Sequence, residues 1–131
     1  MLAEDIEINR TIIMTLMEDT GAELIPAENG RLAVEAFMSN RESFDLIYMD
    51  IHMPEMDGYD ATRKIREDDH EWSKNIPIIA MTANAFAEDV QHCKDAGMND
   101  HIAKPIDLKE VIDKTARYID TKENLIKEGR L

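Results

Sequence analysis

The sequence has a single cysteine, Cys93, so no disulfide can form within the chain. This fits a reducing compartment, and we expect a cytoplasmic location. No apolar run approaches the roughly 20 residues that span a bilayer. The opening residues, MLAED, also lack the basic and apolar segments that are typical of a signal peptide.

Positive charge is scarce. The chain has 15 Lys and Arg residues against 28 Asp and Glu residues, and its net charge is −13. Binding to a phosphate backbone requires clustered basic side chains, so the balance argues against nucleic acid and against anionic membranes as direct partners. A solvated acidic surface explains most of this charge, and a smaller part could belong to a concentrated acidic site.

The composition is typical of one globular domain, with 131 residues of which 44% are hydrophobic and 33% charged. Short apolar runs alternate with segments in which apolar residues recur at helical spacing. The five runs are MLA (1–3), AELIPA (22–27), DLIYM (45–49), IPIIAM (76–81) and HIA (101–103). This alternation predicts an α/β fold in which a five-stranded parallel sheet lies between helices.

Apolar spacing predicts helices over 8–18, 30–38 and 58–70. In the first helix, five apolar residues are expected to share one face, namely Ile8, Ile12, Ile13, Leu16 and Met17.

Capping residues predict two more helices. Asn84 is a plausible N-cap for a helix that ends near Gly97. Asp107 followed by Glu110 resembles a capping box, which predicts a helix beginning at that point.

The order of the strands follows from their composition and from a known topology. Pro26 has no backbone donor, which favours an edge position for the second strand. The order 2-1-3-4-5 of the doubly wound, flavodoxin-like fold satisfies this requirement, and we adopt it. In that fold ligands bind outside the carboxyl ends of the strands, next to strands 1 and 3.

Acidic residues follow both of these strands. Glu4 and Asp5 follow the first, and Asp50 ends the third. Taken singly, each acid could simply cap the next helix. Three carboxylates at one edge repel one another unless a cation lies among them, and an all-oxygen set suits Mg²⁺. The pattern therefore predicts a magnesium site.

The last two strands end in AMTAN and IAKP, which bring Thr82 and Lys104 to the same edge. Alone, Thr82 could be a turn residue and Lys104 a solvated lysine. Beside the acids, however, the set fits phosphoryl transfer to a carboxylate. Asp50 would be the nucleophile, and Lys104 would neutralise charge on the transferred group.

Four motifs resemble, in order and spacing, the receiver (phosphoacceptor) domain of two-component response regulators. They are AED (3–5), MDIHMPEMDG (49–58), AMTAN (80–84) and IAKPID (102–107). The resemblance covers roughly residues 1–120 and is strongest to receivers attached to hybrid sensor histidine kinases. It implies a phosphorelay switch that catalyses only its own phosphorylation and dephosphorylation.

The resemblance also implies individual roles around the predicted magnesium site. Asp50 accepts the phosphoryl group from a phosphohistidine. Asp5 and Asp50 bind Mg²⁺ directly, together with the backbone carbonyl of His52, and Glu4 contributes through water.

Switching roles are carried over in the same way. Lys104 contacts the phosphoryl group, and Thr82 moves toward it. His101 stands where the family usually has a switching aromatic residue, and its imidazole is a departure from the pattern. His52 and Asn84 occupy positions that tune the lifetime of the acyl phosphate.

The implied partners are a histidine kinase or a histidine phosphotransfer domain, with a second phosphotransfer partner possible downstream. The phosphodonor is expected to dock on the helix after Asp5. The surface that switches is expected to comprise the fourth helix (from Asn84), the fifth strand (101–103) and the fifth helix (from Asp107). The chain could also be the cytoplasmic portion of a membrane-anchored kinase.

Some features leave alternatives open. Only three residues precede Glu4, so the first strand is expected to be short and to weaken both the sheet pairing and the placement of Asp5. The tail, 121–131, could extend the last helix or form a linker. Two other functions fit the same fold: a Mg²⁺-dependent phosphohydrolase with an aspartyl nucleophile, and an interaction module that works without phosphorylation.

Overall fold

A computed structural model describes residues 1–83 and 87–131. Its strands form one parallel sheet in the order β2-β1-β3-β4-β5. The bounds are β1 (Leu2–Ala3), β2 (Pro26–Ala27), β3 (Ile47–Asp50), β4 (Ile78–Thr82) and β5 (Asp100–Ala103). The predicted fold class and strand order are confirmed, and the strand that contains Pro26 lies at an edge.

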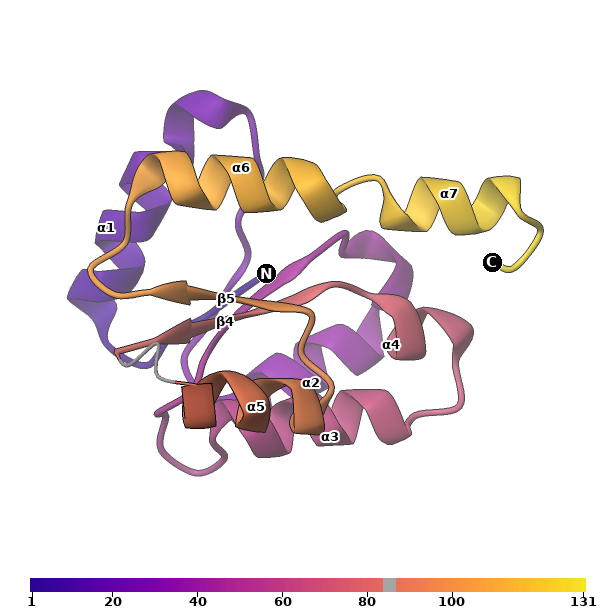
Figure 1. Ribbon diagram of the computed structural model, residues 1–131, viewed down its shortest axis with the longest axis horizontal. Coiled ribbons are helices and arrows are strands. Elements are labelled where there is room, and N and C mark those ends of the chain that lie inside the picture. Colours follow the sequence, from indigo (N-terminus) through magenta and orange to yellow (C-terminus); the bar gives the residue numbers. More distant parts are fainter. Residues whose placement is uncertain (84–86) are drawn as a thin grey trace.

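Helices cover both faces of the sheet (Figure 1). They are α1 (Glu7–Met17), α2 (Gly30–Ser39), α3 (Gly58–Glu67), α4 (Glu71–Asn75), α5 (Ala87–Ala96), α6 (Leu108–Tyr118) and α7 (Thr121–Lys127), with short 3-10 turns η1 (Glu18–Thr20) and η2 (Arg41–Ser43). In Figure 1, α1 and α6 lie on one side of the sheet, and α2, α3 and α5 lie on the other.

The alternation of side chains along β3 explains these layers. Ile47 and Met49 pack into the cluster that includes Phe37 and Ile65 from α2 and α3. Tyr48 belongs to the cluster on the other face, with residues of α1 and α6. Because successive side chains of a strand point to opposite faces, a strand covered on both sides must be apolar throughout.

The first strand is as short as expected, and it pairs on both sides. Leu2 N donates to Ile25 O at 2.9 Å, and Glu4 N donates to Ala27 O at 3.0 Å. On the other side, Tyr48 N donates to Met1 O at 2.9 Å. These bonds extend the pairing one residue beyond each end of β1 and fix the backbone that leads into Asp5.

The five apolar residues that were expected to share one face of α1 differ in burial. Ile13 and Met17 are buried, but Ile8 is 66% exposed, Ile12 50% and Leu16 36%. Ile8, Ile12 and Leu16 recur every four residues, and Ile13 and Met17 form a second row beside them. Only the second row lies against the sheet, so the first row remains open to solvent.

The helix starts and stops follow local chemistry in part. Asp107 caps α6 by accepting a bond from Lys109 N, as predicted. Glu110 Oε1 lies 3.3 Å from Lys114 Nζ, so this side chain forms an ion pair with the residue four positions later in the helix. Asn84, the predicted cap of α5, falls outside the described residues. Gly97 follows α5 with a φ of +105°, which glycine adopts readily.

The tail forms a separate helix, α7, which packs against α4. Leu125 is buried in the same apolar cluster as Trp72. Lys122 Nζ lies 2.9 Å from Asp45 Oδ1 and 5.6 Å from the centre of the Trp72 ring. The division into a domain over 1–120 and a tail remains a prediction. Within the described ranges, no helix is long and apolar enough to cross a membrane.

Candidate functional site

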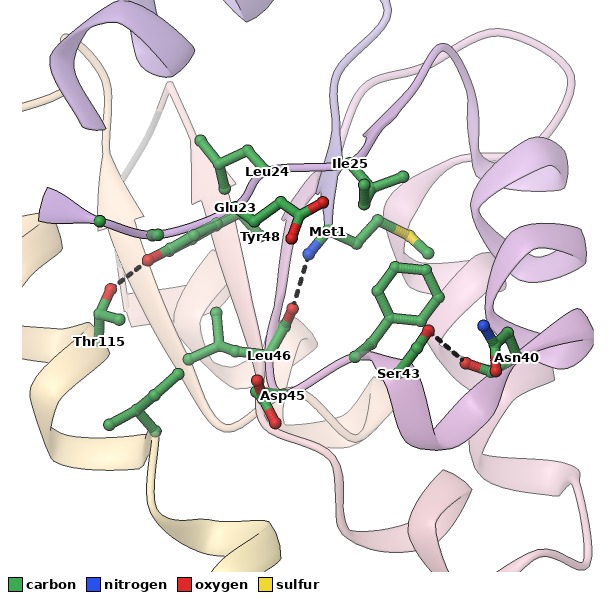
Figure 2. A pocket seen from close by; sticks show the side chains of 14 residues that line it. Met1, Glu23, Leu24, Ile25, Asn40, Ser43, Asp45, Leu46, Tyr48 and Thr115 are labelled. Carbon is green, nitrogen blue, oxygen red and sulfur yellow. Dashed lines mark hydrogen bonds between the residues drawn. The ribbon is translucent and has the colours of Figure 1, made fainter. Parts of the chain in front are cut away.

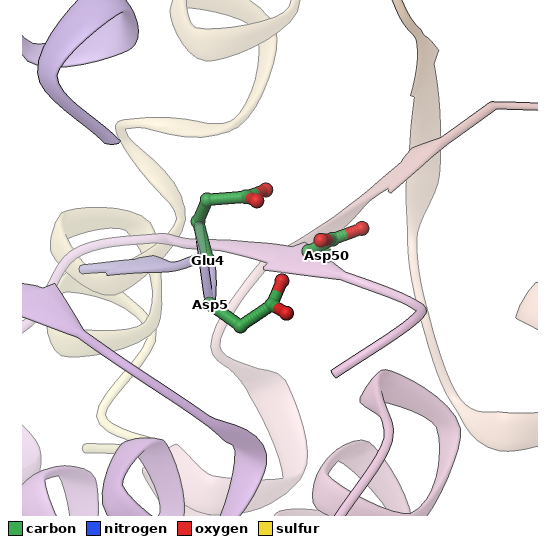
Figure 3. A group of neighbouring side chains, drawn as sticks. All are labelled: Glu4, Asp5 and Asp50. Carbon is green, nitrogen blue, oxygen red and sulfur yellow. The ribbon is translucent and has the colours of Figure 1, made fainter. Parts of the chain in front are cut away.

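The three predicted acids lie together at the carboxyl edge of the sheet. Oxygen atoms of Glu4, Asp5 and Asp50 all lie within 4.8 Å of one another. Figure 3 shows Glu4 and Asp5 extending from the end of β1 beside Asp50 at the end of β3. Glu4 and Asp50 are buried, and Asp5 is half-buried. The sequence prediction of this cluster agrees with the geometry.

The backbone around Asp50 is packed tightly, and glycine makes this possible. A Cβ on Gly58 would lie 2.3 Å from the Asp50 carbonyl oxygen, so α3 can begin this close to β3 only with glycine there. Gly58 N donates to Ile51 O at 2.8 Å and closes the loop between them. Asp57 caps α3 by accepting a bond from Asp60 N.

Lys104 reaches the same cluster from the end of β5. Its Nζ lies 3.1 Å from Asp50 Oδ1 and 3.3 Å from Glu4 Oε2. Lys104 N donates to Thr82 O at 2.8 Å, which holds the end of β5 beside β4. The ammonium group is therefore in place to pair with a carboxylate or with another oxyanion bound to it.

Burial and crowding change the protonation of the two buried acids. Burial, reinforced by the neighbouring Glu4 carboxyl, raises the pKa of Asp50 to about 7. Burial would also raise the pKa of Glu4, but hydrogen bonds and the Lys104 charge outweigh it, and the net pKa is lowered. Burial opposes the charge on Lys104, yet the two acids raise its pKa overall. These directions assign the extra proton of the pair to Asp50 rather than to Glu4.

The remaining predicted residues are placed as follows. Thr82 ends β4 and is buried, and its backbone oxygen accepts from Lys104 N. His52 is exposed in the loop after β3, and Asn84 lies outside the described residues. His101 lies in β5, where its Nδ1 is 3.9 Å from Asp100 Oδ1, and its side chain is 31% exposed.

Two polar residues of α1 support Glu4 and were not predicted. Asn9 Nδ2 donates to Glu4 Oε1 at 3.3 Å, and Arg10 donates to the backbone oxygen of Glu4 at 2.8 Å. The signal available in the sequence was their position in the helix directly after the acidic pair. These bonds help to fix Glu4 in a buried position that a carboxylate otherwise avoids.

A separate cavity of about 580 Å³ lies near the amino ends of the strands, whereas the acidic cluster lies at their carboxyl ends (Figure 2). Met1, Leu46 and Tyr48 line it, and they stand at or next to the starts of β1 and β3. Tyr48 Oη is hydrogen-bonded to Thr115 Oγ1 at its border. Because the carboxylates and Lys104 lie at the other edge, we assign the candidate chemistry to the acidic cluster.

The acidic cluster offers only oxygen donors among its described side chains. Zinc in proteins is usually bound by His and Cys, whereas Mg²⁺ takes carboxylates and waters. With Lys104 as the adjacent cation, three carboxylates leave an excess of negative charge. The residues present therefore fit a hard divalent cation.

Comparison with known proteins gives a consistent result. A family model described as the response regulator receiver domain matches residues 1–116. The chain is 40% identical over 119 residues to hybrid signal transduction histidine kinase L of Dictyostelium discoideum, a match that covers 87% of this chain and 7% of that protein. It is 38% identical over 112 residues to the sensor protein GacS of Pseudomonas syringae pv. syringae, covering 85% of this chain and 12% of that protein.

Solved structures agree with these relatives. The receiver domain of sensor histidine kinase PA1611 from Pseudomonas aeruginosa PAO1, with a magnesium ion coordinated in its active site cleft, is 38% identical with a TM-score of 0.81, covering 90% of this chain and 93% of that one. A receiver domain from Saccharomyces cerevisiae, crystallised with a histidine phosphotransfer signalling protein, is 26% identical with a TM-score of 0.81, covering 89% of this chain and 85% of that one.

Proposed function

The chain belongs to the family of response regulator receiver domains of two-component signalling, and on this basis we propose that it is a phosphorelay switch with Asp50 as its phosphoacceptor. The observation that carries the proposal is the 3.1 Å distance between Lys104 Nζ and Asp50 Oδ1 within a cluster of three carboxylates. Receiver domains are signalling switches, and no separate substrate is proposed for this one.

The proposed reaction is transfer of a phosphoryl group from a phosphohistidine to Asp50. A carboxylate oxygen of Asp50 forms the new O–P bond as the N–P bond to histidine breaks, and the imidazole keeps the electron pair. Lys104 pairs with an oxygen of the transferred group and offsets its charge. Thr82, at the end of the neighbouring strand, is proposed to contact the same group after transfer.

Asp5 and Asp50 are proposed to hold Mg²⁺ directly, with the backbone carbonyl of His52, while Glu4 contributes through water. When bound, the ion supplies positive charge beside the transferring oxygens. The magnesium ion in the Pseudomonas aeruginosa receiver supports this assignment.

The proposed output surface comprises α5, β5 and α6. Side-chain contacts tie the last two elements together through Asp100. Lys114 Nζ lies 3.2 Å from Asp100 Oδ1 and also contacts the backbone oxygen of His101, and Tyr118 Oη donates to Asp100 at 3.1 Å. A displacement of β5 next to Lys104 would therefore be transmitted to α6, which supports a switch at this surface.

The proposed phosphodonor is a histidine kinase or a histidine phosphotransfer domain. The exposed row of Ile8, Ile12 and Leu16 lies on α1, the helix that follows Asp5, and offers an apolar docking surface. The yeast receiver crystallised with a histidine phosphotransfer protein supports this class of partner.

The test is an intact-mass measurement after incubation with Mg²⁺ and acetyl phosphate. We expect wild type to gain one labile phosphoryl group and Asp50→Asn to gain none. Asp57→Asn is the matched control, because asparagine also caps a helix and the position lies in the same loop. Repeated turnover of phosphate esters would favour a phosphohydrolase instead. No mass gain in wild type would favour a module that works without phosphorylation.

A further inference from the structure

The loop between β3 and α3 contains a strained turn that the proposed reaction does not explain. Glu55 has a φ of +65°, and among the described residues it is the one non-glycine residue with positive φ. Met56 N donates to Pro54 O at 2.7 Å across it. A hydrogen bond between residues i and i+2, with a positive φ at the residue between them, defines the γ-turn that is rare and strained.

The side chain of Glu55 holds this turn against the start of α2. Its Oε2 accepts bonds from Asn29 Nδ2 at 3.0 Å and from Arg31 Nε at 3.2 Å. Asn29 is 9% exposed, and its Oδ1 also caps α2 by accepting from Leu32 N at 2.8 Å. The Glu55 brace, by which we mean Glu55 with Asn29 and Arg31, therefore joins the loop to a fixed helix end.

Backbone packing confirms that the loop and α2 meet closely. A Cβ on Gly30 would lie 2.2 Å from the Met56 carbonyl oxygen, so glycine is required between Asn29 and Arg31. At its other end the loop is closed by the bond from Gly58 N to Ile51 O. His52 thus lies between two anchored positions, Ile51 and Glu55. Ile51 is held by Gly58, and Glu55 is held by the start of α2.

We propose that Glu55 is a positioning residue, and that its brace to Asn29 and Arg31 holds the β3–α3 loop so that the His52 carbonyl faces the acidic cluster. This inference rests on the proposed function, because it assigns the loop a part in binding Mg²⁺. A strained turn persists only where its surroundings overdetermine it, and the brace provides that constraint. Without the brace, the turn relaxes and the carbonyl leaves its place.

The test measures the dissociation constant for Mg²⁺ by calorimetric titration of the whole chain. We expect Glu55→Ala to raise that constant about three- to tenfold, the effect of losing two partly exposed polar contacts. Glu55→Gln keeps an oxygen that can accept from Asn29, and we expect it to recover most of the affinity. The rate of phosphorylation by acetyl phosphate at subsaturating Mg²⁺ should fall in parallel with the affinity.

The matched control is Glu35→Ala. Glu35 pairs with the same Arg31 at 2.9 Å and is similarly exposed, but it belongs to α2. Both substitutions remove one negative charge from one partner, so an equal loss of Mg²⁺ affinity in both would overturn the proposal. Unchanged affinity in Glu55→Ala would also overturn it.

Glu55→Gly separates the brace from the strain, because glycine adopts positive φ at little cost but makes no side-chain bond. Weak binding in this variant supports the brace, whereas wild-type affinity would overturn it. Thermal unfolding midpoints within about 3 °C of wild type verify that the variants are folded. If wild type binds Mg²⁺ but never gains a phosphoryl group, the proposed function fails while the affinity series still decides the role of Glu55.

Discussion

The raised pKa of Asp50 predicts that, without Mg²⁺, the protein loses stability as pH rises toward neutrality. In the unfolded chain Asp50 has its ordinary pKa of 3.8, and in the folded protein burial and Glu4 raise that pKa to about 7. Below pH 3.8 both states hold the proton. Between the two values only the folded state keeps it, so folding is favoured less and less as pH rises. Above pH 7 no further loss occurs from this group.

A pKa difference of this size corresponds to roughly 4 kcal/mol of unfolding free energy. Asp50→Asn should lack this dependence, because its amide cannot ionise and can donate to Glu4 as the protonated acid does. Glu4 remains 3.3 Å from Lys104 in the variant, so the lysine keeps a partner. We therefore expect the variant to be similar to wild type near pH 4.5 and more stable than wild type by a few kcal/mol at pH 7.5.

Urea unfolding of both proteins in EDTA, from pH 4.5 to 7.5, measures this difference. Titrations of groups remote from the cluster are shared and cancel between wild type and Asp50→Asn, so the difference reports on Asp50 together with Glu4 and Lys104, whose pKa values depend on it. Added Mg²⁺ at pH 7.5 should stabilise wild type more than the variant and narrow the gap, because a ligand stabilises the state that binds it. Unfolding free energies that stay parallel across this range would refute the assignment of the extra proton to Asp50.

Three further predictions concern other contacts. Lys104→Gln should change the dissociation constant for Mg²⁺ by no more than about threefold, as measured by calorimetry. It should slow phosphorylation by acetyl phosphate, as measured by intact mass, because it removes the charge proposed to face the transferred group. Leu125→Ala should lower the unfolding free energy by about 2–3 kcal/mol and shift the emission of Trp72 to longer wavelength, because α7 covers that part of the core. Arg41 and Ser73 hold the pKa of Asp68 well below its usual range, so Asp68→Asn should destabilise the protein at pH 7 and progressively less as pH falls below about 4, in urea unfolding at each pH.

The sequence was informative where burial is complete. β3 and β4 are covered on both faces, so their apolar runs predicted them directly. The strand order, by contrast, was adopted from a known fold, and only the edge position of Pro26 was argued from chemistry. α4 was missed because its five residues are too few to show a helical period. For α1, the spacing of apolar residues predicted the helix, but it did not predict which of these residues the sheet would cover.

The same division applies to the site. Glu4 and Lys104 are 100 residues apart in the sequence, and they could be predicted to meet because parallel strands bring their carboxyl ends to one edge. No comparable rule relates Glu55 to Asn29. Their contact occurs with a positive φ at a glutamate, which residue preferences argue against. Contacts that break a local rule can be found only in three dimensions.

The charge balance of the site links its stability to its proposed chemistry. Three carboxylates surround one ammonium group, and the two that contact it are almost completely buried. Lys104 can neutralise one of them, so a second positive charge is required near neutral pH. The raised pKa of Asp50 favours a proton there as that charge in the absence of a metal ion, and the same proton would make Asp50 a poor nucleophile in the proposed transfer. A divalent cation that replaces the proton would therefore stabilise the fold and expose the attacking oxygen in one step. The proposed function would thus account for a carboxylate buried at the end of a central strand, where a capping residue would have sufficed for the fold alone.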